Sequence, residues 1–449
     1  MHEHLEPNEM LLRATFRNIL SFKEEVAVSF TAGKSNVIQS HVCRAVKRDD
    51  ISVLKAGIIY GANASGKSNV IKAISVLQDI ALGAYPRQKM EPFRLSSVIE
   101  PVSKIELEFK VDSRYYAYGM EMTLQGIREE WLYEINVRTE KEVFSRKATE
   151  DGFEYTFGTI DGGASARQLL RFLSHGTPKD KSFLSEYIDR NGEGLDSIRT
   201  AYGWFADRLH IIFPDTRYNG LSYRIDADES FSSGIKAMLG YFGTGIHDIR
   251  RIPVKLEETE LSRETLDGIL AKAKRGETYA AASPQGNSLY YITIGEDGQY
   301  DIQALKAVHI DEKNKEVVFE MKQESDGSIR LLDFIPMLLD LLHNPSVYFI
   351  DEIDRSMHPM LSQKLIECYT NSLAGDRDTQ LIFTTHESNL LNLELIRPDE
   401  VWFIEKDQAG SSHATALSEF KPREDVRKGY LQGRYGAIPF FASLKSLKW

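Results

Sequence analysis

Gly61-Ala62-Asn63-Ala64-Ser65-Gly66-Lys67-Ser68 is the most informative segment of this chain. It matches the phosphate-binding pattern G-x-x-x-x-G-K-[ST] and lies between an apolar run at 56–60 and a helix-like run at 68–74. Glycines let the backbone N–H groups of such a loop point at phosphate oxygens, and the following helix adds partial positive charge at its start. The alternative, a glycine-rich turn with a chance lysine, is disfavoured by the strand and helix on either side. The sequence therefore predicts a site for a nucleoside triphosphate.

Each residue of this loop has an expected role. Lys67 should reach the β- and γ-phosphates, and Ser68 should hold Mg²⁺. ATP and Mg²⁺ are therefore the expected cofactors. The other positions expected to contact the nucleotide in or beside the loop are Gly61, Asn63, Ala64, Ser65, Gly66 and Asn69.

The composition is that of a globular protein, with 42% apolar and 27% charged residues. At 449 residues the chain should form two or three domains, or one domain with a large insertion. No apolar run approaches a membrane span, and the polar, acidic first residues do not resemble a secretory signal. Cys43 and Cys368 lack metal-ligand spacing and suit reduced thiols. We therefore expect a cytoplasmic protein without membrane association.

A net charge of −11 argues against general affinity for nucleic acid, so direct nucleic-acid binding is left open. The region from residue 421 onward is a local exception, and a solvated basic tail and a docking surface are equally good interpretations of it. Its cations are Lys421, Arg423, Arg427, Lys428, Arg434, Lys445 and Lys448, against only Glu424 and Asp425.

The order of apolar and polar residues along the chain predicts an α/β fold with an antiparallel β lobe and a core that is interrupted by an insertion. Residues 1–160 hold a strand pair at 12–30, the phosphate loop and β-rich segments with period-two alternation, such as 105–109. Residues 161–285 read as a mostly helical insertion. Residues 286–449 return to alternating strands and helices.

Two apolar strands of the last region end in polar residues. Val347-Tyr348-Phe349-Ile350 is followed by Asp351 and Glu352, and ligands of open α/β sheets sit at such strand ends. Asp351 should bind Mg²⁺ through water, opposite Ser68, and Glu352 is placed to take a proton from the attacking water. The alternative is a surface acidic pair.

The second strand, at 380–385, ends at His386. A lone histidine at a strand end is usually an ordinary polar residue, but its order after the Asp-Glu strand suits a histidine that senses the γ-phosphate. A small loop, Glu324-Ser325-Asp326-Gly327-Ser328, precedes a buried helix at 329–340 and could bind an anion at the helix start. An ordinary N-cap is the alternative for this loop.

Together these elements resemble the ABC-type ATPase heads of the SMC, RecF and OLD kind. The resemblance implies that Ser325 and Gly327 of one copy touch the γ-phosphate held by another, and that Asp354 lies at the seam of this dimer. The Ser-Asp-Gly-Ser sequence departs from the transporter signature Ser-Gly-Gly-Gln, and the glutamine loop has no clear equivalent. Glu129 and Glu130 are the candidates for that region.

Further segments resemble the bacterial AAA-type ATP-binding proteins of abortive-infection and anti-phage operons, which include RloA/AbiL and the PARIS ATPase subunit. The segments that carry this resemblance are 59–69, 91–95, 324–327, 351–359 and 430–439. The resemblance implies an ATPase that senses infection, in response to a phage-derived trigger protein, and holds or releases a separate toxic effector, a nuclease of the TOPRIM type. The roughly sixty residues after His386 are too few for a further catalytic domain. A RecF- or SMC-like clamp that binds DNA during repair is the rival; a transporter subunit is disfavoured by chain length and signature.

Overall fold

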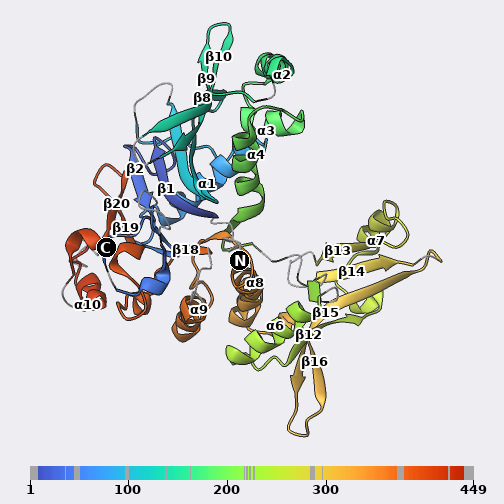
Figure 1. Ribbon diagram of the computed structural model, residues 1–449. Helices are drawn as coiled ribbons and strands as arrows, with labels where there is room; N and C mark the ends of the chain where they lie inside the picture. The colour runs from blue at the N-terminus through green and yellow to red at the C-terminus, as the bar shows by residue number, and fades with distance from the viewer. Residues whose placement is uncertain are drawn as a thin grey trace, which may run out of the picture. The chain divides into compact units, whose positions relative to one another are not determined.

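A computed structural model describes residues 9–35, 37–44, 51–96, 101–136, 139–161, 163–216, 218, 221, 224–225, 228–283, 289–295, 297–371, 379–422 and 425–438. The chain divides into two compact units (Figure 1), each of which is described by itself. The first unit comprises 1–214, 341–355 and 365–449, and the second comprises 215–340 and 356–364.

The first unit contains a seven-stranded antiparallel sheet with the order β10-β9-β8-β7-β6-β1-β2. Side chains on its strands alternate between buried and accessible, as in Ile105, Leu107 and Phe109, because one face of the sheet packs on the core. The strands are β1 (Glu9–Arg17), β2 (Val26–Ser29), β6 (Ser103–Val111), β7 (Arg114–Thr123), β8 (Gly126–Ile135), β9 (Glu140–Thr149) and β10 (Gly152–Phe157).

A six-stranded sheet of the same unit has the order β11-β17-β18-β5-β19-β20. Its first five strands are parallel and β20 is antiparallel to β19. The central strands are buried on both faces, which explains their continuous apolar runs. The strands are β5 (Ala56–Tyr60), β11 (Leu209–Ile212), β17 (Val347–Ile350), β18 (Gln380–Thr384), β19 (Val401–Lys406) and β20 (Ser412–Ala416).

Helices complete this unit, together with a short ribbon of β3 (Val42–Cys43) and β4 (Val53–Leu54). The helices are α1 (Lys67–Ala81), α2 (Gly163–Gly176), α3 (Phe183–Asp189), α4 (Asp196–Gly203), a π-helical turn (Trp204–Arg208), the later part of α9 (Pro359–Asn371) and α10 (Val426–Leu431). Helix α1 follows the phosphate loop directly, so the loop is held between β5 and α1.

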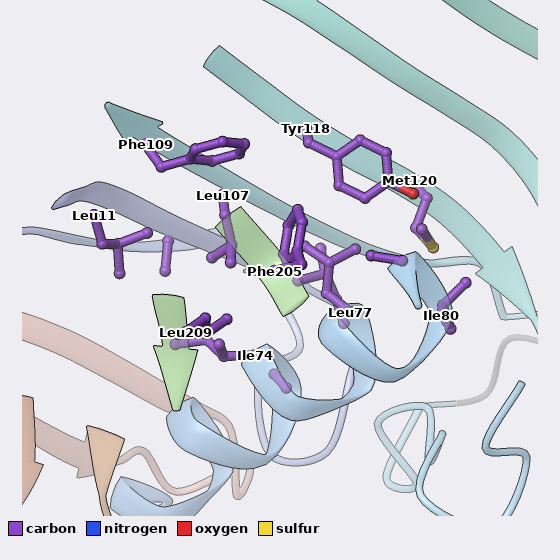
Figure 2. Packing of buried hydrophobic residues seen from close by; sticks show 14 of the residues in the cluster. Leu11, Ile74, Leu77, Ile80, Leu107, Phe109, Tyr118, Met120, Phe205 and Leu209 are labelled. Carbon is purple, nitrogen blue, oxygen red and sulfur yellow. The ribbon is translucent and has the colours of Figure 1, made fainter. Parts of the chain in front are cut away.

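Helix α1 anchors the loop through a deeply buried face. Ile74, Leu77 and Ile80 are fully buried, and Figure 2 shows them beneath side chains of β6 and β7 together with Phe205 of the π-helical turn. The ring of Phe205 lies 5.6 Å from that of Phe109. Burying each such apolar side chain stabilises the fold by about 1.5–3 kcal/mol. The position of α1, and with it the loop, is therefore fixed by packing.

Glu130, a candidate for the glutamine-loop region, lies in a buried ion pair. Its carboxylate lies 2.7 Å from Nε of Arg146, and both side chains are fully buried. It also accepts hydrogen bonds from the Tyr118 hydroxyl at 2.9 Å and from the backbone N–H groups of Phe183 and Leu184. Glu129 points outward and pairs with Lys147 at 3.4 Å. Glu130 thus joins the antiparallel sheet to the start of α3.

We expect Glu130→Gln to destabilise the first unit by about 3–5 kcal/mol, because it leaves the Arg146 charge buried without its partner. Denaturant unfolding followed by tryptophan fluorescence measures this change, since Trp131 and Trp204 lie in this unit. Glu129→Gln, the same chemical change at the accessible neighbour, should cost about 0–1 kcal/mol. Equal effects of the two variants would contradict the role assigned to the buried pair.

The second unit is built on a five-stranded antiparallel sheet, with the path β12-β15-β14-β13 and β16 paired to β15. Its strands and helices are β12 (Asp248–Pro253), β13 (Thr278–Ala282), β14 (Leu289–Ile294), β15 (Tyr300–Ile310), β16 (Glu316–Glu320), α6 (Glu229–Tyr241), α7 (Arg263–Leu270) and most of α8 (Asp326–Leu341). Leu266 of α7 packs on Ile292 and Ile302 of the sheet. The β15–β16 hairpin reaches beyond the other strands of this sheet (Figure 1).

These units divide the chain differently from the predicted boundaries at 160/161 and 285/286. Helix α2 packs Leu170 and Leu173 into the core of the first unit, and β11 joins the parallel sheet. The boundary at 285/286 separates β13 from β14, which pair with each other from Thr278 to Ala282. A helix-like sequence pattern predicts a helix but not the core against which that helix packs. The domain boundaries could therefore not be predicted from the sequence. The expected α/β fold with an antiparallel β lobe is confirmed.

Three expectations from the sequence concern membrane spans, the two cysteines and the basic tail. Among the helices of the described ranges, none combines the length and hydropathy that crossing a bilayer requires. Cys43 is buried and Cys368 is half-buried. In the basic tail, Asp425 caps α10 by accepting from the backbone N–H of Lys428 at 3.0 Å. Arg423, Glu424, Lys445 and Lys448 lie outside the described residues.

Candidate functional site

Two residues of the phosphate loop have a left-handed backbone. Ala64 has φ 63° and Gly66 has φ 106°, both in the left-handed region. A Cβ atom added to Gly66 would lie 2.4 Å from the hydroxyls of Ser21 and Ser412, and one added to Gly61 would lie 2.4 Å from the carbonyl oxygen of Ile404. Gly66 is thus required by both its backbone conformation and its neighbours.

Lys67 lies against the loop that it is expected to serve. Its ammonium donates to the carbonyl oxygens of Gly61 at 2.8 Å and Ala62 at 3.1 Å. Its Nζ atom also lies 3.5 Å from Nδ1 of His386. Burial lowers the pKa of Lys67 to about 8, although the nearby carboxylates of Asp351, Glu352 and Asp354 oppose this shift. The ammonium is therefore an incompletely solvated charge beside two carbonyl oxygens. Charged phosphate oxygens would be stronger acceptors and could replace these carbonyl oxygens.

Ser68 and Asp351 lie in direct contact. The Ser68 hydroxyl donates to Oδ1 of Asp351 at 2.9 Å, although 283 residues separate them. They meet because β17 lies in the same parallel sheet as β5, and the carboxyl ends of parallel strands share one edge. A hydroxyl and a carboxylate are oxygen ligands of the kind that Mg²⁺ prefers, and Mg²⁺ commonly takes few protein ligands besides phosphate and water. The pair fits such an ion.

Glu352 follows Asp351 with an unusual backbone. Its φ of 53° lies in the left-handed region, and its N–H donates to the Thr384 hydroxyl at 2.7 Å. Its side chain remains accessible, with Arg355 as a distant ionic neighbour at 4.0 Å. The carboxylate can therefore receive a proton from water at this sheet edge.

His386 and Asp354 form a third part of the site. One Asp354 oxygen accepts from the Thr385 hydroxyl at 2.7 Å and from the backbone N–H of His386 at 3.3 Å. Burial lowers the pKa of His386, and the Lys67 charge lowers it further. Asp354, expected at a dimer seam, thus also orients the segment that carries the histidine.

The other loop positions vary in their surroundings. The Asn69 amide donates to the Ser21 hydroxyl at 2.8 Å, and the Ser412 hydroxyl donates to the backbone oxygen of Ser65 at 2.6 Å. The Ser65 hydroxyl is buried and finds no hydrogen-bond partner among the described residues. An unsatisfied donor inside a phosphate-binding loop suits an anionic ligand. For Asn63 the structure shows no specific contact within these residues.

Ser325 and Gly327 belong to the second unit. The Ser325 hydroxyl accepts from the backbone N–H of Ser328 at 3.1 Å, so Ser325 caps α8, which begins at Asp326. A Cβ atom at Gly327 would lie 3.0 Å from the backbone oxygen of Ser356. The cap accounts for Ser325 within one copy, and contact with a nucleotide on another copy stays a prediction.

A cavity of about 600 Å³ adjoins the loop in the first unit. It combines apolar side chains with cationic ones. Residues in its lining include Leu20, Asn69, Lys72, Phe93, Phe213 and Lys406. Ligand cavities commonly have this size.

Four residues at the site were missed by sequence reasoning. Ser21 and Ser412 contact the loop from distant segments and have no local signal. Thr384 and Thr385 directly precede His386 and bond to Asp351 and Asp354. Both threonines lie at the end of a strand that is parallel to the Asp-Glu strand, and this position could have indicated that they belong to the site.

Known proteins share features with this chain. An SMC head bound to the C-winged helix domain of ScpA is similar to it, with 12% identity, a TM-score of 0.41 and coverage of 92% of this chain and 99% of the other. The SMC head domain from Thermotoga maritima is similar with 11% identity, a TM-score of 0.37 and coverage of 90% and 98%. No curated protein matches the chain. A family profile matches residues 58–392, which span the phosphate loop, the Asp-Glu strand and the histidine. The chain therefore belongs to the family described as "AAA domain, putative AbiEii toxin, Type IV TA system".

Proposed function

We propose that this protein binds ATP with Mg²⁺ and hydrolyses it, and that two copies assemble around the nucleotide. The observation that carries this proposal is the meeting of Lys67, Ser68, Asp351, Glu352 and His386 at one edge of the parallel sheet. Each is the residue type that phosphoryl transfer to water needs at that place.

The residues divide the chemistry among them. Lys67 would bind the β- and γ-phosphates, while Ser68 and Asp351 would hold Mg²⁺, which when bound offsets the charge of the triphosphate. Glu352 would accept the proton of the attacking water, and His386, held through Asp354, would contact the γ-phosphate. The adjoining cavity has room for the base and ribose. In the test, ATP turnover by the purified protein should depend on Mg²⁺ and stop when EDTA removes it.

Gly66→Ala tests the loop geometry. We expect ATP affinity to fall by about tenfold or more, because the added methyl group meets two serine hydroxyls and the backbone must leave φ 106°. Titration with a fluorescent ATP analogue measures the change. Gly163→Ala is the matched control, since Gly163 also has a left-handed backbone but has open space around it. An equal loss in both variants would mean that general destabilisation, and not the geometry of the phosphate loop, lowers the ATP affinity.

For the biological role, we propose that the ATPase holds or releases a separate toxic effector, a nuclease of the TOPRIM type, when a phage-derived protein signals infection. The family description refers to a toxin of type IV toxin–antitoxin systems, which supports a role in such a module. Co-purification of the product of a neighbouring gene, released or retained according to the nucleotide present, is the expected result.

The rival is a clamp that binds DNA directly, in the manner of RecF or SMC proteins. It predicts binding of bare duplex DNA that weakens steeply as salt rises, because phosphate contacts release counterions. ATP-dependent, salt-sensitive DNA binding without any co-purifying partner would favour the clamp over the effector-holding ATPase.

A further inference from the structure

Thr384 occupies a particular position beside the acid pair. It is the last residue of β18 and its side chain is fully buried. The parallel ladder pairs Ile350 of β17 with Phe383, so Thr384 comes level with Asp351 one position later. The strand pairing therefore brings the Thr384 hydroxyl to the point where β17 ends and the two carboxylates begin.

The Thr384 hydroxyl makes two hydrogen bonds whose directions are determined by chemistry. It donates to Oδ1 of Asp351 at 2.7 Å, because a carboxylate can only accept. It accepts from the backbone N–H of Glu352 at 2.7 Å, because an N–H can only donate. One hydroxyl thus connects the side chain of the first acid to the backbone of the second, and burial keeps water from replacing either bond.

Both bonds bear on groups that the proposed reaction uses. Oδ1 of Asp351 accepts from Ser68 as well, and a Ser68 oxygen that holds a cation no longer needs that bond, whereas the Thr384 bond can remain. Glu352 has a backbone conformation that residues other than glycine rarely adopt, and the bond from its N–H to Thr384 fixes it there.

We propose that Thr384 is a positioning residue, which orients the Asp351 carboxylate and holds the backbone that aims Glu352. Both hydrogen bonds of its hydroxyl go to the two acids, so Thr384 would act through them. Its effect on turnover rests on the proposed ATPase function, whereas its effect on the backbone of Glu352 does not.

Thr384→Val tests the proposal, because valine keeps the branched shape and removes the hydroxyl. Removing such an outer hydrogen-bond partner should lower kcat by about 10- to 100-fold. It should also raise the Mg²⁺ concentration needed for half-maximal turnover by about the same factor. ATP affinity measured without Mg²⁺ should match that of the wild type. Thr384→Ser, which restores the hydroxyl, should recover most of the activity, and Thr384→Ala repeats the comparison if the valine variant does not fold.

Hydrogen–deuterium exchange gives a readout that needs no hydrolysis. The amide of Glu352 should exchange faster in Thr384→Val than in the wild type, because it loses its acceptor. Thr379→Val is the matched control: Thr379 is also buried and lies just before the opposite end of β18. It should change neither this exchange rate nor kcat.

Several results would overturn the inference. Wild-type exchange at Glu352 and wild-type Mg²⁺ dependence in Thr384→Val would remove the positioning role and leave the ATPase proposal standing. If Thr384→Val loses protection from amide exchange throughout the protein, and Thr384→Ser does not restore it, the role of Thr384 is merely structural. If the wild-type protein fails to hydrolyse ATP, the proposed function fails, and the exchange experiment still decides whether Thr384 holds the backbone of Glu352.

Discussion

Lys67→Ala is expected to abolish measurable ATP binding. The Lys67 ammonium is held over the loop by the carbonyl oxygens of Gly61 and Ala62, at 2.8 and 3.1 Å, and would exchange them for phosphate oxygens. A hydrogen bond to a charged group contributes about 1.5–3 kcal/mol, so losing contacts to two phosphates weakens binding by about 10²- to 10⁴-fold. Isothermal titration calorimetry at pH 7 measures the loss.

An exposed lysine of the first unit provides the control. Lys179 lies in neither the loop nor the lining of the adjoining cavity, so Lys179→Ala removes the same charge and leaves both intact. Its ATP affinity should stay close to that of the wild type. Circular dichroism should show both variants folded. Unchanged ATP affinity in Lys67→Ala would refute the assignment of the phosphate loop.

Much of this site could be predicted from the sequence because its functional residues lie in short, contiguous motifs. The loop needs glycines, a lysine and a serine at fixed spacing between a strand and a helix, and the structure has β5 and α1 on either side. Asp351 likewise follows a short apolar run that forms a strand, and such a run can be recognised in the sequence. Since the carboxyl ends of parallel strands converge, the contact of Ser68 with Asp351 followed from these two local patterns.

The parts that could not be predicted depend on distant pairs. Glu130 reads as an acid beside an aromatic strand, and only the fold reveals that Arg146 neutralises it in the core. Ser21 and Ser412 approach Gly66 from opposite ends of the chain. A serine is common and polar, so nothing in its neighbourhood marks it for such a contact. Long-range packing, and not residue type, decides these roles.

Glu352→Gln is expected to bind ATP with nearly wild-type affinity and to hydrolyse it about 10²-fold more slowly or worse, since an amide cannot accept the proton of water. The side chain is accessible and the backbone N–H bonds to Thr384, so glutamine should fit without rearrangement. Single-turnover hydrolysis at saturating ATP measures the rate. Glu394→Gln makes the same change at an exposed position of the first unit and should leave turnover unchanged. Wild-type turnover in Glu352→Gln would remove Glu352 from the mechanism.

The same variant makes assembly measurable, because ATP that is bound but not hydrolysed should hold two copies together. Light scattering of Glu352→Gln with ATP and Mg²⁺ should report a dimer, and without ATP a smaller species. Adding Ser325→Asp should prevent the dimer: aspartate still caps α8, but its charge opposes the triphosphate held by the other copy. Ser325→Asn caps equally well without charge and should dimerise. A dimer that forms equally with aspartate and asparagine would exclude Ser325 from the shared site and leave the hydrolytic role of Glu352 intact, because the two roles depend on different units of the chain.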